Sequence, residues 1–365
     1  MDVSKKRIPR IYSGLTGQID AILLMNGEEP HKDLSFFYAT GYDSGLFEGC
    51  IAILWPDGGV EVLSSALEET SARARDVPVK IYSKKSQRDL MLKESLRGMK
   101  SIGINGAALT VRDLEEIKRS MPGIKTIDVS SAIEKARLVK DEEEVERMRE
   151  ACRIASRVAD EIPNFLEVGM KEYEAAAEIV YMMQRKGASS ISFETISCFG
   201  KNSAEPHHMP DDSILTKGSF ALFDFGAKFR LYCSDITRTF IAGKATKQQV
   251  EMYHTVLEMQ RVGLENIRAG VNGMEVDAAA RAVIARSGTK GTMPHSLGHG
   301  LGLSVHDGGR MAPEVDLKLE ENMILTVEPG LYIPGYGGIR IEDVVRVKAN
   351  GCDVLTTASK ELTVI

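Results

Sequence analysis

The stretch Ser219–Ile241, SFALFDFGAKFRLYCSDITRTFI, constrains the fold more than any other part of the chain. It places Asp224 and Asp235 in a run of strand-forming residues, where a buried carboxylate is costly unless another group pairs with it. An antiparallel hairpin turning at their midpoint, between Phe229 and Arg230, would set them face to face, about 5 Å apart at Cβ. That spacing suits a pair of cations about 3.5–4 Å apart. Two solvated aspartates beside a surface hairpin are the alternative that this stretch alone leaves open.

The second half of the chain repeats this pattern. Glu328 and Glu342 lie on either side of a PGYGG turn and have their midpoint at Gly335 within it, so a second hairpin would also bring two carboxylates face to face. Apolar periodicity and capping residues predict helices beside the hairpins, at 171–186, 247–269 and 274–286. We therefore predict a pseudo-symmetric α+β domain in which both carboxylate pairs meet at the centre.

A domain boundary is expected at about residue 137, because a new helix begins just after it. Asp141 and Glu144 have the spacing of a capping box, and apolar residues follow at helical intervals. A chain of 365 residues also fits two domains better than one core. The predicted domains are 1–137 and 138–365.

The first domain is predicted to be a layered α/β domain. Short apolar runs, such as AILLM near residue 21 and SFFYATGY at 35–42, read as extended segments. They alternate with helical segments expected at 86–99 and 111–121, and such alternation is typical of a sheet covered by helices.

The composition is that of a globular protein with a small-molecule or peptide partner. The net charge is −6, with both signs interspersed, so neither a nucleic-acid footprint nor a polybasic membrane anchor is indicated. No apolar run approaches the roughly 20 residues of a membrane span, and the first residues do not resemble a signal peptide. Five scattered cysteines are typical of reduced thiols, which predicts a cytoplasmic protein.

Charge balance favours two metal ions at the predicted centre. Four carboxylates neutralise two divalent cations, whereas a buried cluster without metal would have to bind protons. Oxygen-rich ligation with one imidazole suits manganese, cobalt or iron better than structural zinc. His295, His299 and His306 lie in one glycine-rich segment, and spacing alone does not decide which of them is the ligand. The glycines beside His299 would let the backbone approach a crowded centre.

Several motifs together resemble the proline-specific pita-bread metallopeptidases, the Xaa-Pro dipeptidases (prolidases) and aminopeptidase P. These motifs are FDFGA…YCSDITRTF, NSAEPHH, HSLGHGLGLSVHD, TVEPGLY, GIRIEDVVRV and the closing LTTASKEL. The resemblance extends from about residue 138 to the end, and the first domain is similar to the smaller N-terminal domain of the same family. It implies a pita-bread (creatinase/aminopeptidase-like) catalytic domain after an α/β domain of the creatinase/prolidase N-terminal type.

The resemblance also implies a set of metal ligands. Five residues would bind two divalent metal ions: Asp224, Asp235, His299, Glu328 and Glu342. Asp235 and Glu342 would bridge the ions, and Glu328 would also carry a proton. Manganese or cobalt is expected, with zinc or iron as alternatives.

Further residues are implied to contact the substrate. His207 and His306 would bind the scissile carbonyl and the intermediate, and Arg310 would pair with the C-terminal carboxylate of a dipeptide. Arg340 would orient a ligand carboxylate. His208 is interpreted as a surface loop residue, and His295 is left without a role.

The function implied is hydrolysis of the bond between an N-terminal residue and proline, by an Xaa-Pro dipeptidase acting on short proline-containing peptides. The alternatives are an Xaa-Pro aminopeptidase acting on longer peptides and a non-catalytic peptide- or protein-binding module. A homodimer is expected, with no nucleic acid or membrane partner. Three positions depart from the family pattern, and one of them is Asp307, which stands where a glutamate is frequent. Leu231 replaces a turn glycine, so a wider or bulged turn is expected, and Gly309 replaces a frequent proline near Arg310.

Overall fold

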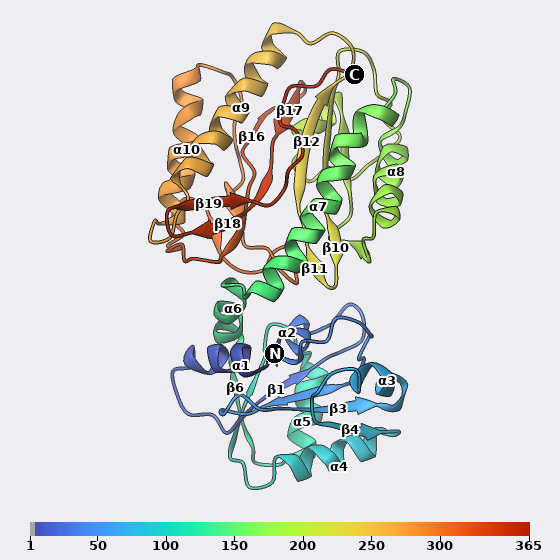
Figure 1. Cartoon of the computed structure of the whole chain (residues 1–365), viewed down its shortest axis with the longest axis vertical. Helices are drawn as coiled ribbons and strands as arrows, with labels where there is room; N and C mark the ends of the chain where they lie inside the picture. The colour runs from blue at the N-terminus through green and yellow to red at the C-terminus, as the bar shows by residue number, and fades with distance from the viewer. Residues whose placement is uncertain (1–3) are drawn as a thin grey trace. The chain divides into compact units, whose positions relative to one another are not determined.

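The computed structural model describes residues 4–365, which form two compact units (Figure 1). One unit ends at Arg137, and the other is Leu138–Ile365. The first three residues of the predicted 1–137 domain lie outside the described residues. None of the helices in residues 4–365 combines the length and apolar character that crossing a bilayer requires.

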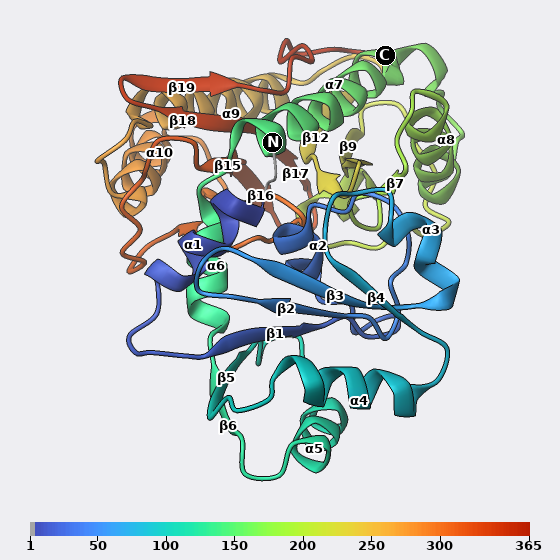
Figure 2. The same ribbon diagram turned by 60° about the horizontal axis from the view of Figure 1, so that its bottom comes forward.

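The first unit is built around one six-stranded sheet with the order β4-β3-β2-β1-β5-β6. Its strands are β1 (Ala21–Met25), β2 (Ile51–Leu54), β3 (Val60–Ser65), β4 (Val79–Tyr82), β5 (Ser101–Ile104) and β6 (Lys125–Asp128). Its helices are α1 (Ser4–Ser13), α2 (Leu34–Thr40), α3 (Glu69–Ala72), α4 (Lys85–Ser95), α5 (Val111–Ser120) and α6 (Ser130–Leu138). Figure 2 shows α4 and α5 on one side of the sheet and α1 and α2 on the other. Leu92 of α4 and Ile117 of α5 pack into the apolar cluster on that sheet face.

The expectation of an extended segment at 35–42 is wrong, because most of SFFYATGY forms helix α2. Asp33 caps the helix by accepting a hydrogen bond from Ser35 N, and Gly41 ends it in a left-handed conformation with φ of 74°. These two end signals outweigh the strand preference of the aromatic residues between them.

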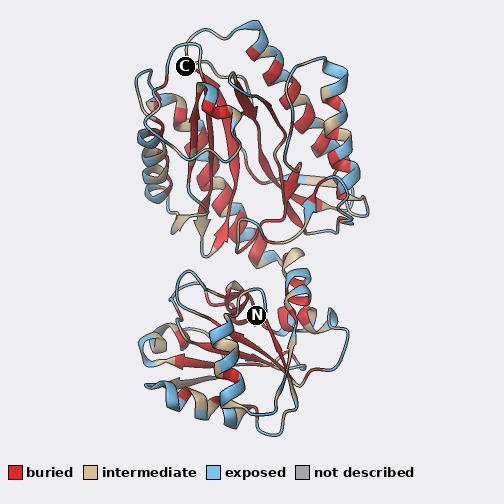
Figure 3. Cartoon of the chain, turned by 180° about the vertical axis from the view of Figure 1, so that it is seen from behind, coloured by how far each residue is buried: buried red, intermediate tan, exposed pale blue. Residues whose placement is uncertain are grey.

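The second unit consists of two halves that each combine two helices with strands (Figure 1). The first half contains α7 (Glu142–Phe165), α8 (Glu172–Arg185), β7 (Ser190–Ile191), β8 (Ile196–Phe199), β9 (Phe220–Phe225), β10 (Ala227–Phe229), β11 (Tyr232–Cys233) and β12 (Ile236–Ile241). The second half contains α9 (Lys247–Asn266), α10 (Gly273–Ser287), β13 (Gly298–His299), β14 (Arg310–Met311), β15 (Ile324–Val327), β16 (Gly330–Ile333), β17 (Gly337–Arg340), β18 (Asp343–Lys348) and β19 (Gly351–Val354). Figure 3 shows the strands buried and the outward helix faces exposed. The predicted α+β architecture is confirmed.

The predicted helix ends are largely confirmed. Asp141 and Glu144 form a full capping box at the start of α7, and Thr246 and Gln249 do so at α9. Helix α10 ends at Ser287, and Gly288 caps it with φ of 67°. Helix α9 is shorter than expected, because it ends at Asn266 rather than near residue 269.

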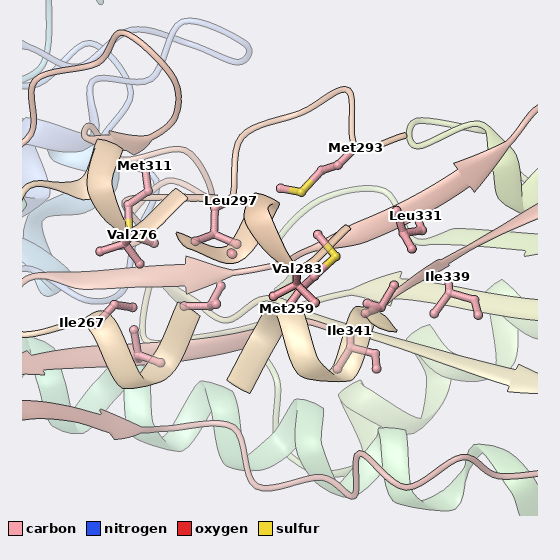
Figure 4. Close-up of a cluster of buried hydrophobic side chains, with 14 of the residues drawn as sticks. Met259, Ile267, Val276, Val283, Met293, Leu297, Met311, Leu331, Ile339 and Ile341 are labelled. Atoms are coloured by element: carbon pink, nitrogen blue, oxygen red, sulfur yellow. The ribbon is translucent and has the colours of Figure 1, made fainter. Parts of the chain in front are cut away.

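The core of the second half fixes which side chains face the centre of the unit. Figure 4 shows Met259 of α9 and Val283 of α10 among apolar strand residues, including Leu331, Ile339 and Ile341. Successive side chains of a strand point to opposite faces. Because Ile341 is fully buried in this apolar cluster, Glu342 is directed to the opposite side.

Candidate metal centre

The first hairpin has a different register from the one expected. Strands β9 and β12 pair Asp224 with Thr237, two positions away from the predicted partner Asp235. The turn is a two-residue loop, Arg230-Leu231, with φ of 45° and 74°. Positive φ at both positions is the type I′ geometry, so the turn is tighter than the wide or bulged turn expected there. A shift of two residues keeps Asp224 and Asp235 on the same sheet face as diagonal neighbours.

The second hairpin has the predicted register. Strands β16 and β17 pair Gly330 with Arg340, and β15 and β18 pair Val327 with Asp343. Glu328 and Glu342 lie between these two ladders, directly across from each other in the same register. The sequence prediction that these two glutamates face each other is confirmed.

His299 reaches the same centre from β13. Its Nε2 lies 3.7 Å from Asp235 Oδ2 and 3.5 Å from Glu328 Oε1. Its Nδ1 donates to Gly300 O at 3.1 Å, which leaves Nε2 free to face the carboxylates. The flanking glycines are required by space: an added Cβ would lie 1.9 Å from Thr326 O at Gly298 and 1.8 Å from Gly308 O at Gly300.

Thr237 and Arg340 join the two hairpins. Arg340 Nη2 donates to Asp224 Oδ2, and its Nε donates to Thr237 Oγ1 at 3.0 Å. Thr237 Oγ1 in turn donates to Glu342 Oε2 at 2.6 Å. The sequence interpretation missed Thr237, and a turn placed at Arg230-Leu231 would have revealed it, since that register sets Thr237 across from Asp224.

A directed chain of hydrogen bonds leads from Arg340 to His295. Arg340 Nη1 donates to Tyr332 OH at 3.0 Å, and that hydroxyl lies 2.9 Å from His295 Nε2. His295 Nδ1 lies 2.9 Å from Ser296 O, so Nδ1 carries the proton and Nε2 accepts from Tyr332. Burial lowers the pKa of His295 to about 4, which fits a neutral ring. Tyr332, on β16, was also missed, because its partner His295 lies 37 residues away along the chain.

Burial and repulsion by neighbouring carboxylates raise the pKa of three carboxyl groups of this centre, those of Asp235, Glu328 and Glu342. Burial, and then the charge of Glu342, raise the pKa of Asp235 well above its ordinary range. Burial, and then the charges of Glu328 and Asp224, do the same to the pKa of Glu342. Burial raises the pKa of Glu328 to about 8.

The donor set fits divalent cations. Asp224 Oδ1, Asp235 Oδ1 and Glu342 Oε1 are buried without a hydrogen-bond partner among the described residues. One ligand atom each from Asp235, His299 and Glu342 lies within 4.8 Å of the others. Among the described residues, Arg340 has the one guanidinium that donates to a side-chain oxygen of these four carboxylates, so the centre lacks positive charge that two divalent ions would supply.

The other predicted residues lie around this centre in different ways. The His306 ring is 4.3 Å from the His299 ring, centroid to centroid. His207 is exposed, but it is close enough for its charge to contribute to the lowered pKa of His306, whose main cause is burial. Arg310 is exposed on β14, where its backbone pairs with His299. Within residues 4–365 its guanidinium has no ion pair.

The strand that carries Glu342 is also attached to the C-terminal segment 356–365. Arg238 uses all five of its N–H donors, and its acceptors are Thr237 O, Glu342 O, Ala358 O, Ser359 O and Asp343 Oδ1. The fully buried Asp343 also accepts from Lys360 Nζ at 2.7 Å. Side chains next to the centre are thus fixed by residues near the end of the chain.

The raised pKa values predict that the metal-free protein loses stability as pH rises. A carboxyl group whose pKa is higher in the folded than in the unfolded protein stabilises the fold fully at a pH below its unfolded pKa. This contribution is lost as the pH rises from the unfolded pKa to the folded pKa. For Glu328 that window runs from the ordinary 4.5 to about 8. After EDTA treatment, the melting temperature is expected to fall between pH 5 and pH 8, and Mn²⁺ is expected to flatten the slope, since cations favour the ionised carboxylates. Calorimetry checks this, and a melting temperature of the metal-free protein that rises over this range would contradict it.

An α/β unit followed by a two-halved α+β unit with a carboxylate-rich centre defines the class of two-domain pita-bread metallohydrolases. The chain belongs to metallopeptidase family M24, whose model matches residues 146–349. The model of the creatinase/prolidase N-terminal domain matches residues 16–139. The predicted family and fold are therefore confirmed, and the chain is a peptidase of a divalent-metal family.

Individual relatives agree with this assignment. The chain is 33% identical to an Xaa-Pro dipeptidase of Pyrococcus horikoshii over 99% of this chain and 100% of that protein. The structure of an Xaa-Pro dipeptidase from Bacillus anthracis matches with a TM-score of 0.91 and 32% identity, over 99% of this chain and 100% of that one. The structure of an X-Pro aminopeptidase from Thermotoga maritima matches with a TM-score of 0.89 and 33% identity, over 95% of this chain and 98% of that one.

Proposed function

We propose that this peptidase is an Xaa-Pro dipeptidase whose centre holds two divalent metal ions. The observation that carries the proposal is the cluster of four carboxylates and His299, with three buried carboxylate oxygens that no hydrogen bond satisfies. The names of the Pyrococcus horikoshii and Bacillus anthracis relatives, similar over nearly the whole chain, support the substrate class.

The proposed ligands are the five residues of the sequence analysis: Asp224, Asp235, His299, Glu328 and Glu342. When bound, a pair of divalent ions lowers the pKa of a water molecule and polarises the scissile carbonyl. We propose manganese or cobalt, with zinc or iron as alternatives, because one imidazole among carboxylates suits these ions.

The surrounding side chains would divide the remaining work. Glu328 lies 3.5 Å from His299 at the centre, and as a carboxylate there it would take a proton from the metal-bound water and pass it toward the leaving nitrogen. His207 and His306 lie beside the centre and can donate hydrogen bonds to the carbonyl oxygen as its charge develops. The Arg340–Thr237 pair holds Asp224 and Glu342 in place.

Arg310 is the proposed selector for dipeptides. Its guanidinium is exposed and has no ion pair within residues 4–365, and its backbone pairs with that of the proposed ligand His299. A free guanidinium near the centre can pair with the C-terminal carboxylate that a dipeptide presents next to the scissile bond. A longer peptide has an amide there instead.

The substitution Arg310→Ala tests the dipeptide preference. The variant is expected to lose about 10- to 100-fold in kcat/KM for an Xaa-Pro dipeptide, which is the effect of removing one charge-assisted hydrogen bond. Little change in kcat/KM is expected for an Xaa-Pro tripeptide. Hydrolysis of both substrates by wild type and variant gives the comparison. Equal losses on both substrates would contradict the role of Arg310.

An Xaa-Pro aminopeptidase is the second candidate, because the similar Thermotoga maritima structure has that name. A wild-type preference for the tripeptide over the dipeptide would favour it. A non-catalytic binding module is the third candidate, and fewer than one divalent ion bound per chain after reconstitution with Mn²⁺ would favour that module. The homodimer and the cytoplasmic location stay predictions, which light scattering and cell fractionation test.

A further inference from the structure

His208 was interpreted from the sequence as a surface loop residue, and that interpretation is wrong. Its side chain is 12% exposed, and its Nε2 lies 2.8 Å from Oε2 of Glu172, whose side chain is fully buried. Its Nδ1 lies 3.4 Å from Glu205 Oε2. The ring therefore bonds inward to helix α8 and is not a solvated loop group.

Glu172 is a hydrogen-bonding hub at the start of α8. Its Oε1 accepts from Phe199 N at 2.6 Å and from Asn202 Nδ2 at 3.0 Å. Its Oε2 accepts from His208 Nε2 at 2.8 Å and from Asp211 N at 3.1 Å. Each carboxylate oxygen thus has two donors, which uses the acceptor capacity of the group. Although Glu172, His208 and Asp211 have the residue types of a metal site, their geometry is that of a satisfied hydrogen-bond network.

The hub holds the turn that presents His207. Glu205 to His208 form a β-turn closed by His208 N donating to Glu205 O at 3.1 Å, with Pro206 at the position where proline favours a turn. His207 is the exposed third residue of this turn. On the side of the centre, Arg340 Nη1 lies 3.5 Å from Pro206 O.

The rest of the loop is fastened to the same helix start by its backbone. Glu172 N donates to Ser213 O at 3.1 Å, and Leu215 N donates to Met170 O at 2.9 Å. These bonds hold the far end of the loop, whereas His208 is the side chain that anchors the turn next to His207.

We infer that His208, bonded to the buried Glu172, is a positioning residue that holds His207 against the metal centre. His207 and His208 are adjacent in one β-turn, so anchoring the His208 ring to Glu172 fixes the backbone from which the His207 side chain extends. The inference rests on the proposed function for its kinetic consequence, since His207 is the group that would contact the substrate. The hydrogen-bond network itself does not depend on that function.

The central test compares two substitutions of one residue. His208→Leu removes the donor to Glu172, whereas His208→Gln keeps an N–H donor of similar reach. His208→Leu is expected to lower kcat for an Xaa-Pro dipeptide about 10- to 100-fold, as expected for a misplaced catalytic group, with little change in KM. His208→Gln is expected to stay within about threefold of wild type. His254→Leu, the same change at an exposed site on α9, serves as the control and leaves kcat unchanged.

A double-mutant cycle with His207 separates positioning from a general loss of structure. If His208 acts through His207, adding His208→Leu to His207→Ala causes no further loss of kcat. Mn²⁺ affinity and stoichiometry, measured by calorimetry, should match wild type, because His208 does not touch the carboxylates of the centre. A further loss in the double variant, or weakened Mn²⁺ binding, would overturn the inference.

A spectroscopic measurement keeps the inference testable without substrate. The imidazole Hε1 resonance of His207 is expected to move in His208→Leu and to stay in place in His208→Gln. If the wild type cleaves no Xaa-Pro peptide, the proposed function fails, and this resonance still decides whether His208 positions His207. A resonance at the wild-type position in His208→Leu would refute the positioning role.

Discussion

Replacing Asp235 with asparagine is expected to lower Xaa-Pro dipeptide hydrolysis about 10³-fold and, at the same time, to stabilise the metal-free protein. The activity falls because Asp235 lies among His299 and the other carboxylates, where its charge would hold the cations. The metal-free protein gains stability because a buried carboxylate, which neighbouring carboxylates repel, is replaced by a neutral amide. Each additional kcal/mol of unfolding free energy raises the melting temperature by about 2–4 °C in a unit of this size.

Calorimetry with and without Mn²⁺ measures both effects in one series. Wild type should melt higher when Mn²⁺ is added, and Asp235→Asn should lose most of that shift. Asp353→Asn, an exposed site on β19, is the matched control and should change neither property. Undiminished Mn²⁺ binding by Asp235→Asn would show that the cluster is not the metal centre.

Replacing Arg238 with alanine is expected to cost about 3–5 kcal/mol of unfolding free energy in the second unit. The change removes one partner of the buried Asp343 and leaves four backbone carbonyls without their donor. Because one of those carbonyls belongs to Glu342, Mn²⁺ affinity should also weaken, by about 10- to 100-fold.

Unfolding in guanidinium chloride, followed by circular dichroism, measures the loss of unfolding free energy in the Arg238 variant. Arg261→Ala is the control, since that arginine makes two exposed ion pairs on α9 and its removal should leave the transition in place. A loss below about 1 kcal/mol in Arg238→Ala would contradict the role assigned to the buried network.

The sequence predicted the parts of this site that follow from strand periodicity and turn chemistry. Glu328 and Glu342 were placed across from each other correctly, because the PGYGG turn has glycine and proline at positions that determine where the chain reverses. The helix caps at Asp141 and Thr246 were predictable for a similar reason, because capping depends only on residues within one turn of helix.

The parts that were missed depend on contacts between distant segments. The Arg230-Leu231 turn adopts positive φ without glycine, so nothing local predicted its register. The preference of single residues also failed at α2, where Asp33 and Gly41 decide the structure. The partner of His208 is 36 residues away in Glu172, a distance at which one sequence offers no pairing signal.

The attachment of the C-terminal segment has a consequence for how the protein is made. The buried Asp343 pairs with Lys360 as well as with Arg238, and Ile365 N donates to Ile241 O at 2.9 Å. Synthesis starts at the N-terminus, so the first unit can fold before Lys360 and Ile365 have been made, whereas strands of the second unit need these later residues for their bonds. Until they emerge, the nascent second unit holds the carboxylates of the future centre in strands that still lack their last partners.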